Sequence, residues 1–233
     1  MNDIFNTDVP LKTETPAFAK HVLPAVPFSE VYLEDCVKSL KRYADNHFDL
    51  AIVDPPYGIM KNTNPVLRKA KMGKLNWDIL PDEDYWEELF RVSKNVFVFG
   101  AQYFPLNNPR TVVFWDKENY NPLYGDGELC FYFGKLKDMR TAKRNLGGVI
   151  KIKCSEKQDK IHPTQKPIKL YDTILHYFGN KGDLILDTHL GSGSSRIAAY
   201  KGGFNFVGFE IDQEYYEKQE KRFNDFKSQL RLF

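Results

Sequence analysis

Two short apolar runs do most to limit the folds open to this chain. They read DLAIV at 49–53 and DLILD at 183–187, and neither run alternates between polar and apolar residues. Strands with that pattern are buried on both faces, as happens in parallel sheets that helices cover on each side. The runs therefore predict an α/β fold built on a doubly wound, Rossmann-like sheet.

The rest of the chain, from Glu30 onward, alternates between strand-like and helix-like stretches. The expected strands are 31–33, 49–53, 95–99, 110–115, 129–133, 183–186 and 204–209, and the expected helices are 36–43, 82–92, 167–179, one from about 192 and one from 212. With 233 residues, 42% of them hydrophobic, the chain can bury a sizeable core. We expect residues 1–29, interrupted by four prolines, to form an extended arm, and residues 30–233 to form a single domain.

Several function classes are disfavoured by what the sequence lacks. The longest apolar run, near 95–104, is shorter than the roughly 20 residues that a bilayer requires. Asp3 and Asp8 stand where an export signal would carry basic residues, so we expect a cytoplasmic protein without a membrane segment. Cys36, Cys130 and Cys154 form no C-x-x-C pair, which predicts reduced thiols and no metal site.

Basic charge is concentrated in two segments, although the net charge of the chain is only +2. Residues 135–169 hold 11 Lys and Arg against 3 Asp and Glu, and residues 61–74 hold five basic residues and no acid. Such runs are often solvated faces, but two of them on an acidic body favour a polyanion partner. The candidate phosphate-binding residues are Lys61, Arg68, Lys69, Lys71, Lys143, Arg144, Lys151 and Lys153. With its two glycines, 135–161 is interpreted as an insertion rather than as part of the sheet.

The apolar run 183–187 leads into a pattern typical of nucleoside-binding sites. Gly191 and Gly193 form a turn before a helix rich in small residues, and the next strand ends at Glu210, 17 residues after Gly193. Glycines let a ligand approach the backbone, and the helix N-terminus offers unpaired N–H groups. A carboxylate at the following strand end can accept from both ribose hydroxyls. Arg196 stands where a dinucleotide motif would have its third glycine, so the pattern favours an adenosine with a cationic or neutral tail over NAD.

A second motif, Asp54-Pro55-Pro56-Tyr57-Gly58, directly follows the other apolar run. Two prolines stiffen the backbone and leave carbonyl oxygens free to accept hydrogen bonds. Beside them stand a carboxylate that can accept from an amino group and a ring that can stack on a planar base. The alternative interpretation is a rigid turn with a core tyrosine. It is less favoured because the nucleoside-binding pattern at the glycine turn belongs to the same expected sheet.

At these residues the sequence resembles the S-adenosylmethionine-dependent amino-group DNA methyltransferases, in the group whose catalytic motif precedes the cofactor motif. The resemblance runs from about Val31 to Arg222 and includes Asp35 and the stretch HPTQKP at 162–167. Asp at the first position of DPPY is the form typical of adenine N6 enzymes, whereas cytosine N4 enzymes more often have Ser there. In the glycine motif, His189 replaces an aromatic ring that the family usually has, and 135–161 is short for a target-recognition region.

The resemblance implies a role for each matching residue. Asp54 and the Pro55 carbonyl would accept hydrogens from the target amine, while Tyr57 stacks on an adenine flipped out of duplex DNA. The implied catalytic residues are Asp54, Pro55, Pro56 and Tyr57. The implied residues for S-adenosylmethionine are Asp35, Asp54, His162, Lys166, Asp187, His189, Gly191, Ser192, Gly193, Ser194, Glu210 and Ile211. His189 itself is assigned no chemical role.

Alternatives remain open at this point. The acceptor could be cytosine N4, RNA or a protein amide, although the basic segment disfavours a protein. The chain could instead be a non-catalytic nucleic-acid-binding subunit with the same fold, against which stand Asp54, Tyr57, Asp187 and Glu210. A restriction endonuclease partner would be a separate chain, and the sequence leaves the oligomeric state undetermined.

Overall fold

The computed structural model describes residues 26–58, 78–118, 126–135, 150–155 and 160–230. The strands are β1 (Ser29–Leu33), β2 (Leu50–Val53), β3 (Val96–Phe99), β4 (Thr111–Asp116), β5 (Gly127–Phe133), β6 (Ile150–Lys153), β7 (Leu184–Asp187) and β8 (Asn205–Glu210). The helices are α1 (Cys36–Leu40), α3 (Glu83–Val92), α5 (Ile168–Phe178), α6 (Ser194–Gly202), α7 (Gln213–Leu230) and the 3₁₀ turn η1 (Ala101–Tyr103). The expected helix 36–43 ends early, at Leu40.

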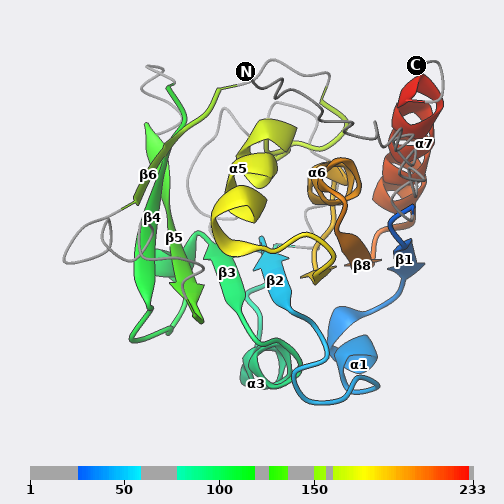
Figure 1. Ribbon diagram of the computed structural model, residues 1–233. Coiled ribbons are helices and arrows are strands. Elements are labelled where there is room, and N and C mark those ends of the chain that lie inside the picture. The colour runs from blue at the N-terminus through cyan, green and yellow to red at the C-terminus, as the bar shows by residue number, and fades with distance from the viewer. Residues whose placement is uncertain (1–25, 59–77, 119–125, 136–149, 156–159, 231–233) are drawn as a thin grey trace, which may run out of the picture.

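The strands form one sheet in the order β1-β8-β7-β2-β3-β5-β4-β6 (Figure 1). The first five strands in that order are parallel to one another, whereas β5 runs antiparallel to both β3 and β4. The apolar runs became the adjacent parallel strands β2 and β7, which confirms the α/β doubly wound fold. Because parallel strands end at the same edge, the residues after β1, β8, β7 and β2 meet there.

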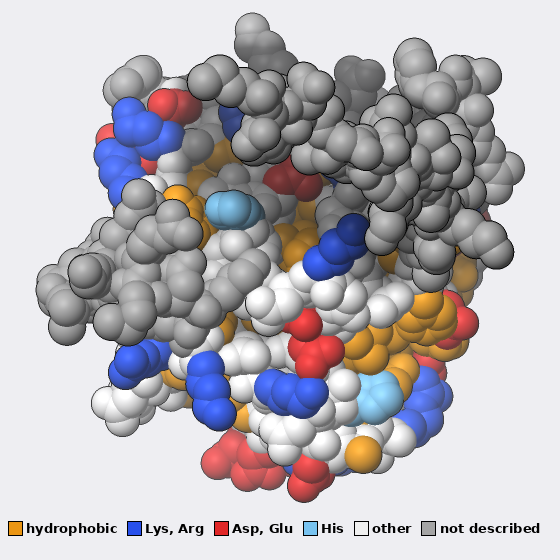
Figure 2. Space-filling model, in the orientation of Figure 1, with side chains coloured by type: hydrophobic (Ala, Val, Ile, Leu, Met, Phe, Trp, Pro, Cys, Tyr) orange, Lys and Arg blue, Asp and Glu red, His pale blue; other side chains and the backbone are white. Residues whose placement is uncertain are grey.

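Strand β6 corrects one expectation from the sequence. Residues 150–153 were expected to lie outside the sheet, but they pair in parallel with β4. Ile150 and Ile152 point inward while Lys151 and Lys153 are exposed, a period-two alternation that the high positive charge of the segment obscured. On the face drawn in Figure 2, the described Lys and Arg side chains stand among Asp and Glu side chains. The rest of 135–161 lies mostly outside the described residues, so its role in target recognition remains a prediction.

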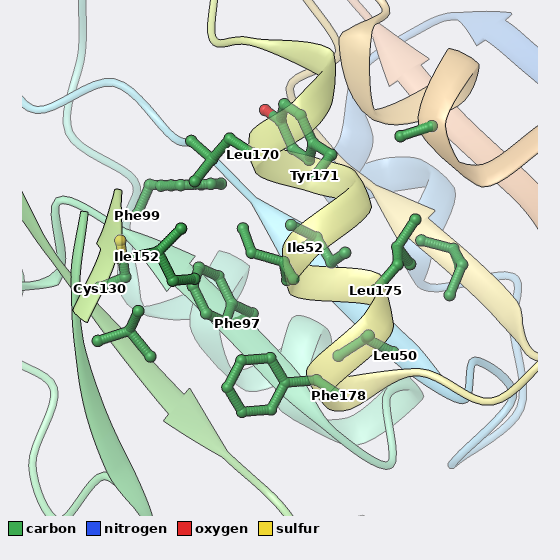
Figure 3. Packing of buried hydrophobic residues seen from close by; sticks show 14 of the residues in the cluster. Leu50, Ile52, Phe97, Phe99, Cys130, Ile152, Leu170, Tyr171, Leu175 and Phe178 are labelled. Atoms are coloured by element: carbon green, nitrogen blue, oxygen red, sulfur yellow. The ribbon is translucent and has the colours of Figure 1, made fainter. Parts of the chain in front are cut away.

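Helices cover both faces of the sheet, which gives two cores. Leu50 and Ile52 of β2 pack with α5 and α6, whereas Ala51 and Val53 pack with α1 and α3. Figure 3 shows α5 lying across β2 and β3, with Phe97, Leu175 and Phe178 between helix and sheet. Burying both faces of β2 explains why DLAIV shows no polar alternation.

Two expectations about absent features can be compared with the structure. None of the helices among the described residues is long and apolar enough to cross a membrane. Cys36, Cys130 and Cys154 form no disulfide bond. Burial raises the pKa of the Cys36 thiol to about 12, so that thiol remains protonated at neutral pH.

Candidate active site

Four carboxylates mark the edge of the sheet where the parallel strands end. Asp35 follows β1 and caps α1, accepting from the Lys38 amide at 3.1 Å. Glu210 and Asp187 are the last residues of β8 and β7, and Asp54 directly follows β2. The sheet order thus brings the two sequence motifs, 137 residues apart from Asp54 to Gly191, to adjacent strands.

The Asp54 carboxylate lies in a buried network rather than alone. Its Oδ1 accepts from the Tyr57 hydroxyl at 2.6 Å, and its Oδ2 accepts from Lys166 Nζ at 2.5 Å. The same Tyr57 hydroxyl lies 2.6 Å from Glu128 Oε1, and Lys166 Nζ lies 3.5 Å from that oxygen. Burial raises the pKa of Asp54; the Lys166 ammonium opposes that change and the Glu128 carboxylate adds to it.

Lys166, one of the expected cofactor residues, contacts two buried carboxylates. Its side chain is 5% exposed and spans Asp54 and Glu128 from the loop before α5. Burial lowers its pKa, but the two carboxylates outweigh that effect and hold the pKa above its ordinary value. Lys166 consequently remains charged and belongs to the Asp54 network, beside the faces of Phe99 and Tyr57.

The Tyr57 ring has a partner that the sequence did not indicate. It stacks on Tyr103 with ring centroids 5.1 Å apart and an interplanar angle of 21°. Gly100 lies so close that a Cβ there would stand 2.3 Å from Tyr57 Cζ. A target base stacking on Tyr57 would therefore have to use the face opposite Tyr103.

The glycine turn has the conformation that its sequence predicts. Gly191 and Gly193 have positive φ angles of 52° and 71°, which residues other than glycine rarely adopt. The Glu210 carboxylate stabilises the turn by accepting from the Gly191 amide at 2.8 Å, and it also accepts from the amides of Ile211 and Asp212, after β8, at 3.0 Å. A carboxylate offers about four lone-pair positions, so one remains for a ligand hydroxyl.

Asp187 is buried at the start of this turn. It accepts from the Ser195 hydroxyl at 2.5 Å and from the His189 amide at 3.0 Å. Burial raises its pKa to about 7, so the charge of Asp187 responds to pH in the neutral range.

The two histidines of the motifs are neutral at physiological pH. Burial lowers the pKa of both His162 and His189 to about 4. His189 Nδ1 lies 2.9 Å from the Thr188 hydroxyl, and its ring packs edge-on against Tyr85. His189 is therefore an uncharged, hydrogen-bonded ring in the turn, and its lack of a chemical role stays a prediction.

The other expected cofactor residues surround the same turn. His162 packs on Tyr215 and lies 3.5 Å from the Cβ position of Gly191, which brings the HPTQKP stretch to the glycine motif. The hydroxyls of Ser192 and Ser194 lie 3.1 Å apart. Ile211 is 66% exposed next to Glu210, as a residue facing a bound ring would be.

The candidate DNA-binding residues are only partly described. Lys61, Arg68, Lys69, Lys71, Lys143 and Arg144 lie outside the described residues. Lys151 forms an ion pair with Asp116 at 2.8 Å, and Lys153 lies 3.7 Å from Glu118. Both are more than half exposed, so a phosphate could compete for either ammonium.

Sequence reasoning missed Glu128. It lies in β5 with a side chain that is 10% exposed, on the strand face shared with Cys130 and Tyr132. The expected strand begins at 129, two residues after β5 begins at Gly127. If the alternation of β5 is extended back by one residue, Glu128 falls on the inward face. This inward charged residue is the sequence signal that could have identified it.

Sequence comparison agrees with this arrangement. The profile of a family described as DNA methylase, of the N6/N4 type, matches residues 115–221, from β4 into α7. Over this segment the chain is thus similar to the amino-group DNA methyltransferases. Its individual relatives include the type II methyltransferase M.HpaI of Haemophilus parainfluenzae, 26% identical over 83% of this chain and 75% of the relative. M2.MboI of Moraxella bovis, also a type II methyltransferase, is 23% identical over 86% of this chain and 92% of the relative.

Solved structures share the fold. A complex of M1.HpyAVI with SAM superposes with a TM-score of 0.60 and 19% identity, covering 84% of this chain and all of that one. The cytosine-N4-specific PvuII DNA methyltransferase gives a TM-score of 0.57 and 14% identity, over 87% and 93% of the two chains. At such identities these likenesses establish the fold alone.

Proposed function

We propose that this protein transfers a methyl group from S-adenosylmethionine to the N6 amino group of adenine in duplex DNA. The observation that carries the proposal is the position of Asp54 beside the glycine turn, at the ends of the adjacent strands β2 and β7. Asp at the first position of the DPPY motif favours adenine, by resemblance to the adenine N6 enzymes. Both type II methyltransferase relatives support DNA as the substrate.

The residues around the glycine turn fit the proposed cofactor. Glu210 keeps one lone pair for a ribose hydroxyl, and the exposed side chain of Ile211 gives an adenine ring an apolar surface. The SAM complex of the similar M1.HpyAVI supports the same assignment. When bound, S-adenosylmethionine would supply an electrophilic methyl group on a sulfonium.

The protein's own part is to orient the amine and to free its lone pair. An exocyclic amine is a poor nucleophile because its lone pair is delocalised into the ring. Hydrogen bonds from its two hydrogens to Asp54 and to the Pro55 carbonyl favour a pyramidal nitrogen, and fixed positions remove the entropy cost of the encounter. Flipping the base costs a few kcal/mol, of which stacking on Tyr57 offsets about 1–3 kcal/mol.

The proposal is tested by incubating the purified protein with duplex DNA and labelled S-adenosylmethionine, then analysing the nucleosides by mass spectrometry. N6-methyladenine is the expected product. N4-methylcytosine would support the alternative base, and label in RNA alone would exclude DNA as the substrate.

A variant distinguishes transfer by this site from a contaminating activity. Asp54→Ala should lower turnover more than 100-fold, since the acceptor for the amine hydrogen is gone, yet keep cofactor affinity within about tenfold. Turnover above a tenth of the wild-type value would remove Asp54 from the proposed role. A non-catalytic subunit would bind DNA without labelling it at all.

A further inference from the structure

The Tyr57 hydroxyl makes short contacts with two carboxyl groups, and these contacts indicate how many protons the three groups hold. It lies 2.6 Å from Asp54 Oδ1 and 2.6 Å from Glu128 Oε1. A phenol carries one hydrogen, and a strong, nearly linear hydrogen bond uses that hydrogen for one acceptor. The second short contact therefore needs a second proton, carried by one of the two carboxyl groups.

We propose that Glu128 is a positioning residue that shares one proton with Asp54 through the Tyr57 hydroxyl. The inference rests on the proposed methyl transfer for its functional meaning, but the proton sharing itself belongs to the protein alone. Glu128 reaches this site only because β5 runs antiparallel beside β3. Its side chain, like that of Asp54, is largely buried, at 10% and 18% exposure.

The charged groups around the pair include lysines on neighbouring elements and the Asp187 carboxyl at the end of β7, whose pKa is raised mainly by burial and further by the Asp54 carboxylate. Lys166 lies before α5, 2.5 Å from Asp54 Oδ2 and 3.5 Å from Glu128 Oε1, while Lys117, after β4, lies 3.2 Å from Glu128 Oε2. The Cys130 thiol, on the same face of β5, is held protonated by burial, which raises its pKa. The lysines favour ionised Glu128 more than ionised Asp54, because Glu128 faces both.

The sharing provides a destination for the proton that the reaction releases. In the proposed transfer, the amine nitrogen would bond to the methyl group as the methyl–sulfur bond breaks with its electron pair left on sulfur, so the nitrogen would carry a positive charge and one hydrogen too many. That N–H bond breaks, the proton moves to Asp54, and the Asp54 proton can move to the Tyr57 oxygen as the Tyr57 hydrogen moves to Glu128. The tyrosine ends as a phenol, the charge of the two carboxylates rises by one, and no other reactant is needed.

The first test follows the side-chain carboxyl carbons of the protein by ¹³C NMR during a pH titration, with Asp54→Asn to assign the Asp54 signal. In the wild-type protein, the Asp54 and Glu128 signals should each show both steps of a coupled titration. Glu128→Gln should lower the Asp54 midpoint by about one pH unit or more, because the opposing negative charge is removed. The control Glu87→Gln, at an exposed position on α3, should leave the midpoint unchanged.

A second comparison separates proton sharing from repulsion between the two carboxylates. In a Tyr57→Phe background, Glu128→Gln should lower the Asp54 midpoint by less than half as much, because the bridging hydroxyl is gone. Equal effects in both backgrounds, or an Asp54 midpoint unmoved by Glu128→Gln, would overturn the proposal. The proposal would also be overturned if Asp54 and Glu128 each titrated in a single, independent step in the wild-type protein.

Activity gives the functional readout. The acid limb of the turnover profile should move to lower pH in Glu128→Gln by the same amount as the Asp54 midpoint, with KM for DNA changed less than threefold. An acid limb unmoved while the midpoint shifts would overturn the positioning role. If the wild-type protein methylates no DNA, the proposed function fails, while the NMR titration still decides the sharing.

Discussion

Burial acts on the acids and the bases of this site in opposite directions. It raises the pKa of Asp187 to about 7 and lowers the pKa of His189 to about 4, because each group is driven toward its uncharged form. A ligand with a cationic group near Asp187 would favour the carboxylate and release a proton. The Asp35 carboxylate favours the charged form of His189 but does not outweigh burial, so the residue is an uncharged polar ring in a packed turn.

The low pKa of His189 predicts a loss of stability in acid. The ordinary value is 6.5, so between pH 6.5 and about 4 the unfolded chain binds a proton at His189 that the folded protein does not. The contribution is therefore complete above pH 6.5 and is lost as the pH falls toward 4, by at most about 1.4 kcal/mol per pH unit. Urea unfolding of the wild type and His189→Gln should show their difference in unfolding free energy shrinking over this range. His176→Gln, at an exposed position on α5, is the control, and a constant difference for His189→Gln would contradict the assignment.

At the scale of elements, the turns after the strands position the reactive side chains. After β3 the chain passes through Gly100, with a φ of 57°, into η1, which carries Tyr103 against the Tyr57 ring. The absence of a side chain at Gly100 leaves room for that ring. A local turn thus determines where the aromatic group of a different motif lies.

Gly100→Ala should therefore displace Tyr57 and lower turnover at least tenfold. The matched control is Gly182→Ala, because Gly182 also has a positive φ, 91°, but a Cβ there would meet nothing within 4 Å. Both variants should lose about 1–2 kcal/mol of stability from backbone strain, measured by urea unfolding. Only Gly100→Ala adds the collision with Tyr57, and equal activities of the two variants would show that the ring has room to move.

Strand β6 is the element on which the DNA-binding prediction can be tested within the described residues. If Lys151 and Lys153 contact phosphates, the double Ala variant should show a shallower fall of the logarithm of the DNA-binding constant with the logarithm of salt concentration. The magnitude of the slope should decrease by about 1.8, or 0.9 for each charge. The control is the double variant Lys201→Ala, Lys218→Ala. These lysines lie on α6 and α7, and each also forms an ion pair with an acidic side chain. Salt titrations of DNA binding measure the slope. A wild-type slope in the β6 variant would mark these lysines as a solvated face and direct attention to 61–74.

At the scale of the whole molecule, binding of the cofactor at the edge of the sheet is linked to the free energy of unfolding. The Glu210 carboxylate, at the end of β8, accepts from the Gly191 amide of the glycine turn and from the amides of Ile211 and Asp212, and it is the proposed acceptor for the cofactor ribose. A ligand that binds only the folded protein stabilises it, by about 2.7 kcal/mol at a concentration of 100 Kd.

Glu210→Ala should weaken that linkage. A tenfold loss of affinity lowers the stabilisation by the same S-adenosylmethionine concentration to about 1.4 kcal/mol. Unfolding with and without the ligand separates this loss from the lower stability of the free variant, which has lost an acceptor for three amides. Glu217→Ala, at an exposed position on α7, should keep the wild-type value. An undiminished ligand effect in Glu210→Ala would limit Glu210 to supporting the turn.

The sequence by itself determined the parallel centre of the fold and the two motifs. Runs such as DLAIV are typical of strands buried on both faces, and the ends of parallel strands place Asp54, Asp187 and Glu210 at one edge whatever the remaining order. Local chemistry also predicted the glycine turn, because positive φ angles favour glycine at 191 and 193.

Only the tertiary structure decided which side chains meet Asp54. Glu128 is 71 residues from Tyr57, and Lys166 is 112 residues from Asp54. Their contacts depend on β5 entering antiparallel beside β3 and on the loop before α5 crossing the strand ends. Residue patterns report which face of a strand is buried, but not which distant strand will lie beside it. The partners of a buried charge are therefore set by the order of strands in the sheet.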